Sequence, residues 1–200
     1  MRKLLLLSSL ALSKPFNYLY FGGDYDNTRH SPKYTHYVLN ASQINADVAK
    51  RDTMDFWRDD SLGTMSTKEY VKFGYDRGHM VPAEDMDYSV LAMFQTFSMA
   101  NISPQVKELN RGPWRILEKN LRDSAVKYGS ISIWTGPLYR GQPIIKRGMQ
   151  IPSDFFKVFC TKKKCTGFVY PNSPEIQKLP QDSFLVNIKL ISKETGLKFK

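Results

Sequence analysis

The sequence predicts a single domain in which helices pack against a mixed β-sheet. Apolar, strand-like runs occur at residues 131–135, 155–160 and 166–170, and a long helical period lies between Pro113 and Gly129. The chain has 200 residues, a length that suits one domain and can bury a sizeable core without help from disulfides or metals. No fixed-period repeat or extended low-complexity segment indicates a second domain.

The first residues are typical of a secretory signal. A charged start, Met1-Arg2-Lys3, precedes an apolar run at residues 4–12, and Ala11-Leu12-Ser13 would serve as a small-x-small cleavage site. A mitochondrial presequence should be amphipathic and rich in arginine, whereas this run is apolar all round, so export is favoured. The other alternative is an uncleaved apolar segment packed on the domain. We therefore expect a signal segment at residues 1–13 and the domain at 14–200.

Three stretches that follow have a readable period. Residues 34–39 predict a strand, and residues 70–75 alternate briefly and predict a second strand that delivers Asp76 to His79 at its end. The polar stretch 52–68 between them is typical of a long loop. Apolar residues then recur at helical spacing over 89–97, which predicts a short amphipathic helix packed on the core.

For the longer helix, between Pro113 and Gly129, the sequence indicates both the helical period and the two ends. Its apolar face consists of Trp114, Leu117, Leu121, Ala125 and Tyr128. Pro113 lies in its first turn and Gly129 lies just past its end, the positions that these two residue types favour.

Two polar residues at this helix are ambiguous from their positions alone. Asn110 stands at the beginning of the helix, where it would be an ordinary cap. Glu118 lies eight residues further, about 12 Å along the axis at roughly 1.5 Å per residue, so the two cannot easily share one ion directly. Unless a ligand involves it, Glu118 would be a solvent-facing partner of Lys119 or Arg122.

The composition favours a polyanionic partner. The chain carries 29 Lys and Arg against 19 Asp and Glu, a net charge of +10, with an isoelectric point near 9.5. Nucleic acid is the commonest partner of such a charge, and an anionic membrane surface would also explain it. No stretch approaches the roughly 20 apolar residues of a membrane span.

The two cysteines favour a disulfide. Cys160 and Cys165 flank Thr161-Lys162-Lys163-Lys164 between two strand-like runs, so their sulfur atoms could meet across a hairpin. An even number of cysteines in an exported protein favours such a bond. A zinc site is disfavoured because no further cysteine or histidine lies near in the sequence.

The chemistry of the chain is expected at residues 75–86, Tyr-Asp-Arg-Gly-His-Met-Val-Pro-Ala-Glu-Asp-Met. His79 could take a proton from water, and Arg77 could supply a fixed positive charge for an anionic transition state. Gly78 between them lets the backbone come close to a substrate or metal. The alternatives are that His79 merely ends a strand and that Arg77 is a salt-bridged structural residue.

The pattern Asp-Arg-Gly-His, an apolar pair and Pro-Ala resembles the signature of the DNA/RNA non-specific endonucleases, the family of endonuclease G and the secreted bacterial nucleases. Further blocks follow in the family's order, so that the resemblance covers roughly residues 25–199. These blocks are Phe56-Trp57-Arg58-Asp59-Asp60, Met99-Ala100-Asn101-Ile102-Ser103-Pro104-Gln105, Leu109-Asn110 with Trp114 and Leu117-Glu118, Trp134-Thr135-Gly136-Pro137-Leu138, Pro152-Ser153-Asp154-Phe155-Phe156-Lys157 and Pro171-Asn172.

The resemblance implies an α+β fold, with a central, largely antiparallel sheet flanked by helices and a ββα-metal (His-Me finger) nuclease site. It implies one Mg²⁺ ion, replaceable by other divalent ions such as Mn²⁺, held by Asn110 and several waters. His79 would be the general base, Arg77 would neutralise the phosphate, and Glu118 would position a metal-bound water. Asn101 would contribute to substrate binding or site geometry. Arg58 would touch phosphate or form a surface ion pair with Asp59 or Asp60.

The function implied is a magnesium-dependent, sugar-non-specific endonuclease that cleaves DNA and RNA and leaves 5′-phosphate ends. It would read little sequence, because basic grooves grip the backbone. The alternatives are a 5′ exonuclease of the same fold and a non-catalytic basic nucleic-acid-binding protein. Relatives of this kind are often homodimers. The leader predicts a secreted or periplasmic protein, with a mitochondrial location as the alternative.

Overall fold

A computed structural model of the chain describes residues 13–200. The expected signal segment therefore lies outside the described residues, except for Ser13. That residue already belongs to strand β1 (Ser13–Asn17), where it pairs with Asp26 of β2 (Gly22–Asp26). Strand pairing thus begins one residue before the expected start of the domain. No helix among the described residues is long and apolar enough to cross a membrane.

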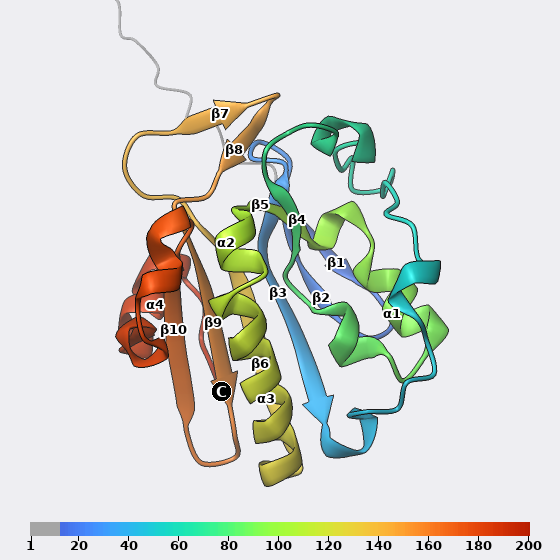
Figure 1. Ribbon diagram of the computed structural model, residues 1–200, viewed down its shortest axis with the longest axis vertical. Helices are drawn as coiled ribbons and strands as arrows, with labels where there is room; N and C mark the ends of the chain where they lie inside the picture. Colours follow the sequence, from blue (N-terminus) through green and yellow to red (C-terminus); the bar gives the residue numbers. More distant parts are fainter. Residues whose placement is uncertain (1–12) are drawn as a thin grey trace, which may run out of the picture.

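The centre of the molecule is a seven-stranded sheet in the order β1-β2-β3-β6-β9-β10-β11 (Figure 1). Every pairing between its described strands is antiparallel, which confirms the largely antiparallel sheet and corrects the mixed sheet expected from the strand-like runs. The predicted strands lie inside observed ones: β3 (Ser31–Asn40), β6 (Ser130–Leu138), β9 (Asp154–Cys160) and β10 (Cys165–Pro171), with β11 (Leu185–Val186) at the edge.

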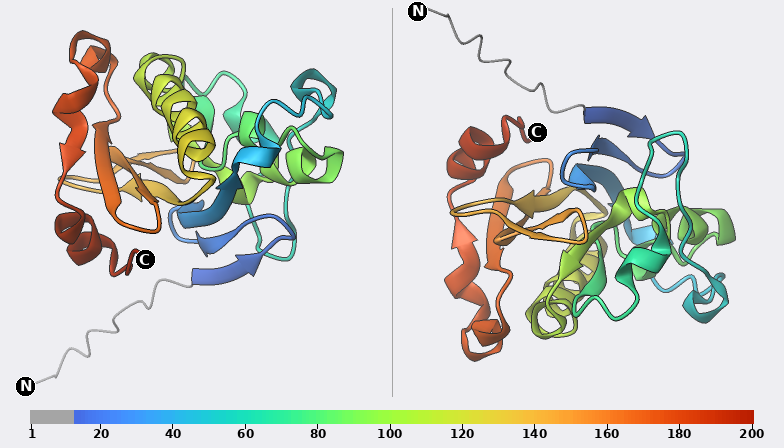
Figure 2. Two further views of the ribbon diagram at one scale, coloured as in Figure 1. Left: turned by 90° about the horizontal axis from the view of Figure 1, so that it is seen from below. Right: turned by 90° about the horizontal axis from the view of Figure 1, so that it is seen from above.

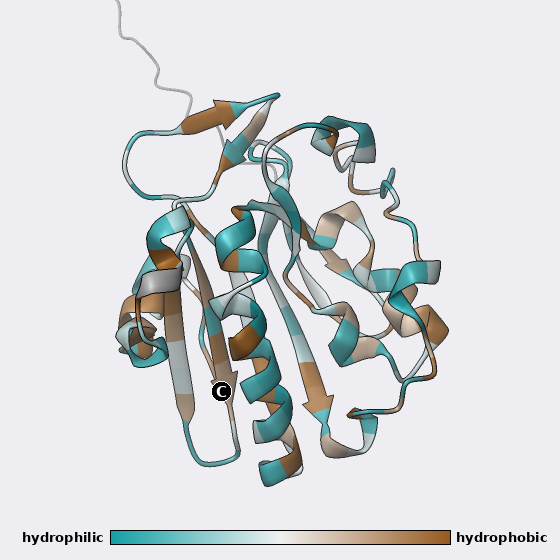
Figure 3. Ribbon diagram, in the orientation of Figure 1, coloured by the Kyte–Doolittle hydropathy of each residue, from teal (hydrophilic) through white to brown (hydrophobic). Residues whose placement is uncertain are grey.

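Helices cover both faces of this sheet (Figure 2). Helix α3 (Pro113–Tyr128) is the predicted long helix, and it buries Leu117 and Leu121 in one cluster with Ile133 of β6. Helix α4 (Ile188–Thr195) buries Ile191 on the other face, together with Val158 of β9. Side chains alternate between the faces along each strand, so one sheet supplies two cores. Hydrophobic and hydrophilic stretches alternate along α3, as an amphipathic helix requires (Figure 3).

A smaller ββα unit lies beside the sheet. Strand β4 (Asp76–His79) pairs antiparallel with β5 (Ile102–Gln105), and α2 (Lys107–Asn110) and α3 follow directly. Between the two strands the chain forms a 3-10 helix, Ala83–Met86, and helix α1 (Val90–Thr96). Helix α1 agrees with the predicted helix at 89–97, and Ser89 caps it by accepting a hydrogen bond from the Ala92 amide. The Asp-Arg-Gly-His part of the motif, residues 76–79, therefore forms the first strand of this unit.

The strand predicted at 70–75 is wrong. The chain there is a 3-10 helix, Thr67–Tyr70, followed by a turn in which Lys72 and Gly74 have φ angles of 52° and 89°. Positive φ angles interrupt an extended strand. The guanidinium of Arg147 donates hydrogen bonds to the carbonyl oxygens of Glu69 and Val71, which no neighbouring strand binds among the described residues.

Arg147 lies in the turn of a hairpin formed by β7 (Ile144–Lys146) and β8 (Met149–Ile151). Further 3-10 helices occur in the connecting segments, at Ala41–Gln43, Arg51–Thr53, Met99–Asn101, Pro174–Lys178 and Gln181–Phe184.

Cys160 and Cys165 form the predicted disulfide, where they face each other across the β9–β10 hairpin. The turn of this hairpin lies far from α2 and β5 (Figure 1).

Reduction of this disulfide should destabilise the protein by about 2 kcal/mol, the chain-entropy value for so short a loop. Because the bond lies far from the ββα unit, reduction should leave that unit unchanged. Thermal unfolding with and without reductant, and of the Cys160→Ser/Cys165→Ser variant, measures the loss. An unchanged melting temperature would contradict a stabilising role for the bond.

Candidate active site

The ββα unit and α3 enclose a cavity of about 600 Å³. Its lining is dominated by charged and polar side chains, which is unusual for a ligand pocket because most pockets are mainly apolar. The lining residues are Arg51, Arg77, Arg111 and Arg115, Asp76, Glu84 and Glu118, His79 and Asn110, with Phe56, Pro82 and Ala83. Four of the residues predicted to act in the site, His79, Arg77, Glu118 and Asn110, therefore meet in one cavity.

His79 lies at the end of β4 and is only 7% exposed. Its ring packs against Phe56 and Phe97, with centroids 5.3 and 5.1 Å away. The imidazole is hydrogen-bonded to the backbone of Arg77, whereas Nε2 is buried without a partner among the described residues. Burial, reinforced by the positive charges of Arg51 and Arg77, lowers the pKa of His79 to about 3. The ring is therefore neutral at physiological pH and can accept a proton.

Arg77 precedes the histidine on the exposed side of β4, and its guanidinium lies 4.3 Å from the centroid of the Phe56 ring. A stacked guanidinium keeps its N–H donors free for a ligand. This geometry supports the prediction of a fixed positive charge beside His79, in place of the alternative of a salt-bridged structural residue.

Gly78 is required by the packing behind the strand. A Cβ atom at this position would lie 2.7 Å from Cδ and 2.8 Å from Cβ of the buried Gln105. The close contact between β4 and Gln105 thus gives this glycine a packing reason that the sequence did not indicate.

We expect Gly78→Ala to push β4 away from β5 and to lower the free energy of unfolding by about 1–3 kcal/mol, the usual cost of overpacking a core. Because His79 is the next residue, its position should change as well. Denaturant unfolding measures the loss, and a midpoint equal to that of the parent would show that Gln105 can move aside.

Asn101 does not reach the cavity. Its side chain is fully buried, accepts a hydrogen bond from the Val81 amide and donates to the carbonyl oxygens of Val81 and Thr96. These bonds fix the chain immediately after His79. A substrate contact by Asn101 is therefore wrong, and its part in the site geometry is what the structure supports.

Arg58 is also absent from the cavity. Its side chain is 55% exposed and forms an ion pair with Asp60 at 2.9 Å. The surface ion pair, which the sequence left open as an alternative, is therefore the observed arrangement. Arg51, and not Arg58, is the arginine of this region that lines the cavity near His79.

Asn110 is the last residue of α2, and the N-cap of α3 is Gly112, so the interpretation of Asn110 as the cap of the long helix is wrong. The Asn110 side chain instead donates from Nδ2 to Oδ2 of Asp76, at 2.9 Å. Arg111 holds the same carboxylate with two hydrogen bonds of 2.8 and 2.7 Å. Asp76 thus fixes the amide with its nitrogen turned toward the carboxylate, which leaves Oδ1 as the free ligand atom.

The carboxylate of Asp76 is held in its charged form. Burial alone would raise its pKa, but the hydrogen bonds from Arg111 and Asn110 outweigh burial, and the pKa is lowered. A charged Asp76 accepts hydrogen bonds only, so it determines which end of the Asn110 amide faces it.

Glu118 is turned inward and is not the solvent-facing residue that its position indicated. Its Oε1 accepts a hydrogen bond of 3.1 Å from Nζ of Lys157, which projects from β9. Burial raises the pKa of Glu118, and the nearby Lys157 ammonium opposes this effect. Arg122, which the sequence offered as a partner of Glu118, forms ion pairs with Glu84 and Asp85.

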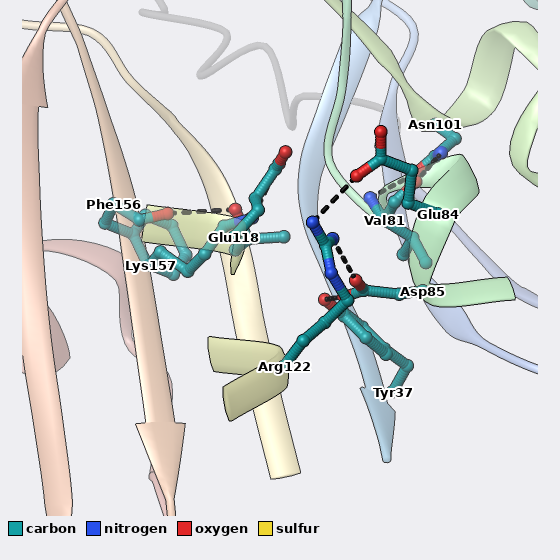
Figure 4. A network of polar contacts seen from close by, with 10 residues as sticks. Tyr37, Val81, Glu84, Asp85, Asn101, Glu118, Arg122, Phe156 and Lys157 are labelled. Carbon is teal, nitrogen blue, oxygen red and sulfur yellow. Dashed lines mark hydrogen bonds and ion pairs between the residues drawn. The ribbon is translucent and has the colours of Figure 1, made fainter. Parts of the chain in front are cut away.

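Arg122 joins α3 to the segment that follows His79 (Figure 4). It donates to Glu84 at 2.7 Å and to Asp85 at 2.9 Å, and Asp85 accepts a further hydrogen bond of 2.6 Å from Tyr37 of β3. Asp85 is fully buried, where burial raises its pKa. This network fixes the 3-10 helix 83–86 against the body of the protein, and with it the part of the cavity wall formed by Ala83 and Glu84.

Three arginines of the cavity, Arg51, Arg111 and Arg115, were not predicted from the sequence. Arg115 had a usable signal, because it precedes Glu118 by three residues and so shares its face of α3. Arg51 had none, since it comes from a 3-10 turn at the edge of the polar loop. Together they make the cavity suited to a phosphate group.

A metal ion would have few protein ligands here. Among residues 13–200 no group of three His, Cys, Asp or Glu side chains could hold an ion. The cavity nevertheless offers the Asn110 amide oxygen as a ligand atom and the carboxylate of Glu118 as an acceptor for a water of the ion. Such a donor set fits a hard cation that keeps most of its water, as Mg²⁺ does.

Comparison with known proteins identifies the family. The family model described as DNA/RNA non-specific endonuclease matches residues 11–200. The chain belongs to the DNA/RNA non-specific endonuclease family. The α+β architecture agrees with a solved structure of an EndoG/EndoGI complex, with a TM-score of 0.83 and 25% identity over 92% of this chain and 84% of that chain.

Curated members of the endonuclease family are also similar over most of the chain. The mitochondrial Nuclease 1 of Schizosaccharomyces pombe is 32% identical, with 86% of this chain and 62% of the relative covered. The mitochondrial endonuclease G of Homo sapiens is also 32% identical, with 80% of this chain and 61% of the relative covered. The chain thus spans about three fifths of the length of these relatives.

Proposed function

We propose that this protein is a magnesium-dependent endonuclease that hydrolyses phosphodiester bonds of both DNA and RNA and leaves 5′-phosphate ends. One observation carries the proposal. His79, whose Nε2 has no hydrogen-bond partner within residues 13–200, and the oriented amide of Asn110 line the same cavity, among four arginines. A general base, a ligand atom for a hard cation and a cluster of phosphate-binding groups are the parts that hydrolysis of a phosphodiester requires.

Each residue then has a distinct task. The arginines bind the scissile phosphate and balance its charge, and Arg77 is the one that belongs to β4 itself. His79 takes a proton from the attacking water through Nε2. The phosphate anion stabilises the imidazolium that forms, so substrate binding raises the proton affinity of a ring that is otherwise a weak base. Asn110 would hold the cation, and Glu118 would orient one of its waters. A magnesium ion held there would supply Lewis-acid stabilisation of the departing 3′ oxygen.

A second hollow shares Asp76 with the cavity and is lined by Lys72, Lys107 and Lys146 together with Tyr75. The cavity and this hollow together form the groove in which we place a chain longer than one nucleotide. Cations and an aromatic ring suit a phosphate backbone and its bases without reading their identity. This continuity favours an enzyme that acts within a polynucleotide of any sequence.

The test is incubation of covalently closed circular plasmid and of RNA, each with magnesium and with chelator. The proposal expects nicked and then linear plasmid, degraded RNA, no cleavage in chelator, and new ends that accept a label only after phosphatase treatment. Cleavage of linear DNA alone would favour the 5′ exonuclease. Binding without cleavage of either nucleic acid would favour a non-catalytic binding protein.

The compartment is a separate proposal. Relatives from Schizosaccharomyces pombe, Bos taurus, Homo sapiens and Saccharomyces cerevisiae are all named mitochondrial nucleases. These names support the mitochondrial alternative over secretion. Localisation of a tagged full-length protein in its own cells decides between them.

The pH dependence of cleavage follows from the buried base. The pKa of His79, lowered to about 3, keeps the ring neutral well below the usual titration range of histidine. Because kcat/KM reports the free enzyme, we expect it to stay level between pH 7.5 and 5.5, where an ordinary histidine of pKa about 6.5 would lose about tenfold. The pH profile of kcat/KM on plasmid measures this, and a half-maximal point near 6.5 would show that the base is exposed to water.

A further inference from the structure

Lys157 is a lysine in the interior of the protein. It lies in the middle of β9 and its side chain is 0% exposed. The neighbours Phe156 and Val158 face the α4 side of the sheet, so the lysine points to the opposite side, toward α3. Lysine is almost never fully buried without a partner, because desolvation of an ammonium group is costly.

Both partners of the lysine come from one face of α3. Nζ donates to Oε1 of Glu118 at 3.1 Å and lies 4.4 Å from the centroid of the Trp114 ring. Trp114 and Glu118 are four residues apart, so they stand one above the other on the helix. The fully buried indole holds the ammonium in place from one side, and the carboxylate receives its hydrogen bond on the other.

The contact involves only one oxygen of Glu118. Oε1 is bound to the lysine, while Glu118 also lines the active-site cavity. The remaining oxygen, Oε2, is therefore available to a ligand in the cavity. Besides Lys157, two charged groups from nearby elements face this carboxylate, namely Arg122 and Asp85. Arg122 is already bound to Glu84 and Asp85, which makes Lys157 the cation that fixes the direction of Glu118.

We propose that Lys157 is a positioning residue that acts on cleavage only through Glu118, by holding its carboxylate directed at the cavity. The inference rests on the proposed function, in which Glu118 orients a water of the cation. A purely structural role is the competing explanation. It does not require a lysine, because apolar residues commonly replace a buried ion pair without loss of stability.

A double-mutant cycle on turnover separates the two explanations. The variants are Lys157→Met, Glu118→Gln and the two combined, assayed on plasmid at saturating magnesium. We expect Lys157→Met to lower kcat by roughly 10–100-fold, the usual effect of losing a partner of a metal-site group. KM for DNA should hardly change, because the lysine does not touch the groove. In the Glu118→Gln background, Lys157→Met should lower kcat no further. Equal losses in both backgrounds would overturn the proposal.

A second readout does not depend on activity. In metal-free protein, Lys157→Met leaves a buried carboxylate unpaired and should lower the melting temperature, and adding Glu118→Gln should recover part of the loss. If the two substitutions are additive in melting temperature, the contact does not hold Glu118 and the inference fails. Lys119→Met is the matched control, since Lys119 is the exposed neighbour of Glu118 and pairs with Asp123. It should match the parent in both assays.

The outcomes also distinguish this inference from the proposed function. A parent protein that leaves plasmid and RNA intact in magnesium contradicts the function itself. A parent that cleaves, together with a Glu118→Gln variant that cleaves equally fast, keeps the function and overturns the role of Lys157, because no positioned carboxylate is then needed.

Discussion

Replacement of His79 by alanine should lower the rate of plasmid cleavage by roughly 10²–10⁴-fold, the range that a general base contributes. The reason is that Nε2 of His79, a residue that lines the cavity, is buried without a hydrogen-bond partner among the described residues. Retention of DNA binding is expected, since the arginines of the cavity remain. Single-turnover cleavage and a filter-binding assay measure the two properties on the same preparation.

The matched control for this substitution is His36→Ala. His36 is stacked on Trp134 on the central sheet, with ring centroids 4.3 Å apart, and does not line the cavity. Its loss should leave cleavage unchanged. Because His79 also packs between two phenylalanines, far-UV circular dichroism must show that His79→Ala is folded. A folded His79→Ala variant that cleaves at the parent rate would show that the histidine is structural.

Asn110→Ser should lower cleavage by roughly 10²–10³-fold, because loss of a metal ligand removes several kcal/mol of transition-state stabilisation. Serine is too short to present an oxygen where the Asn110 amide does. The variant should also need more magnesium for its residual activity. A magnesium titration of the cleavage rate, compared between variant and parent, measures both effects.

Two further variants define what the asparagine does. Asp76→Asn removes the charged acceptor that orients the Asn110 amide and also the partner of Arg111, so it should likewise raise the magnesium concentration needed for cleavage. Asn120→Ser, on the exposed side of α3, is the matched control and should behave like the parent. A parent-like magnesium optimum in Asn110→Ser would mean that another residue holds the ion.

The elements with a strong local period could be predicted from the sequence. Helix α3 has an apolar face, a proline in its first turn and a glycine at its end, and all three are local properties. The strands β3, β6, β9 and β10 were found for the same reason. The strand at 70–75 was wrong because the chain turns at Lys72 and Gly74. Arg147, which is more than 70 residues away in the sequence, binds the carbonyl oxygens of Glu69 and Val71 beside this turn.

In the candidate site, too, the residues could be predicted from the sequence, whereas the contacts that orient them could not. His79, Arg77, Asn110 and Glu118 stand in recognisable blocks, and the structure brings them to one cavity. The contacts that orient them are long-range and leave no local signal. Asp76 reaches Asn110 across 34 residues of sequence, and Lys157 reaches Glu118 across 39. Asn101 and Arg58 were assigned to substrate because a motif shows which residues recur, but not which way a side chain points.

Nicking of covalently closed plasmid by the parent and by His79→Ala, side by side in magnesium and in chelator, tests the central claim most directly. The account predicts rapid nicking by the parent in magnesium, none in chelator, and a loss of at least about 100-fold in the variant. Equal nicking by the folded variant, or undiminished nicking by the parent in chelator, would contradict it.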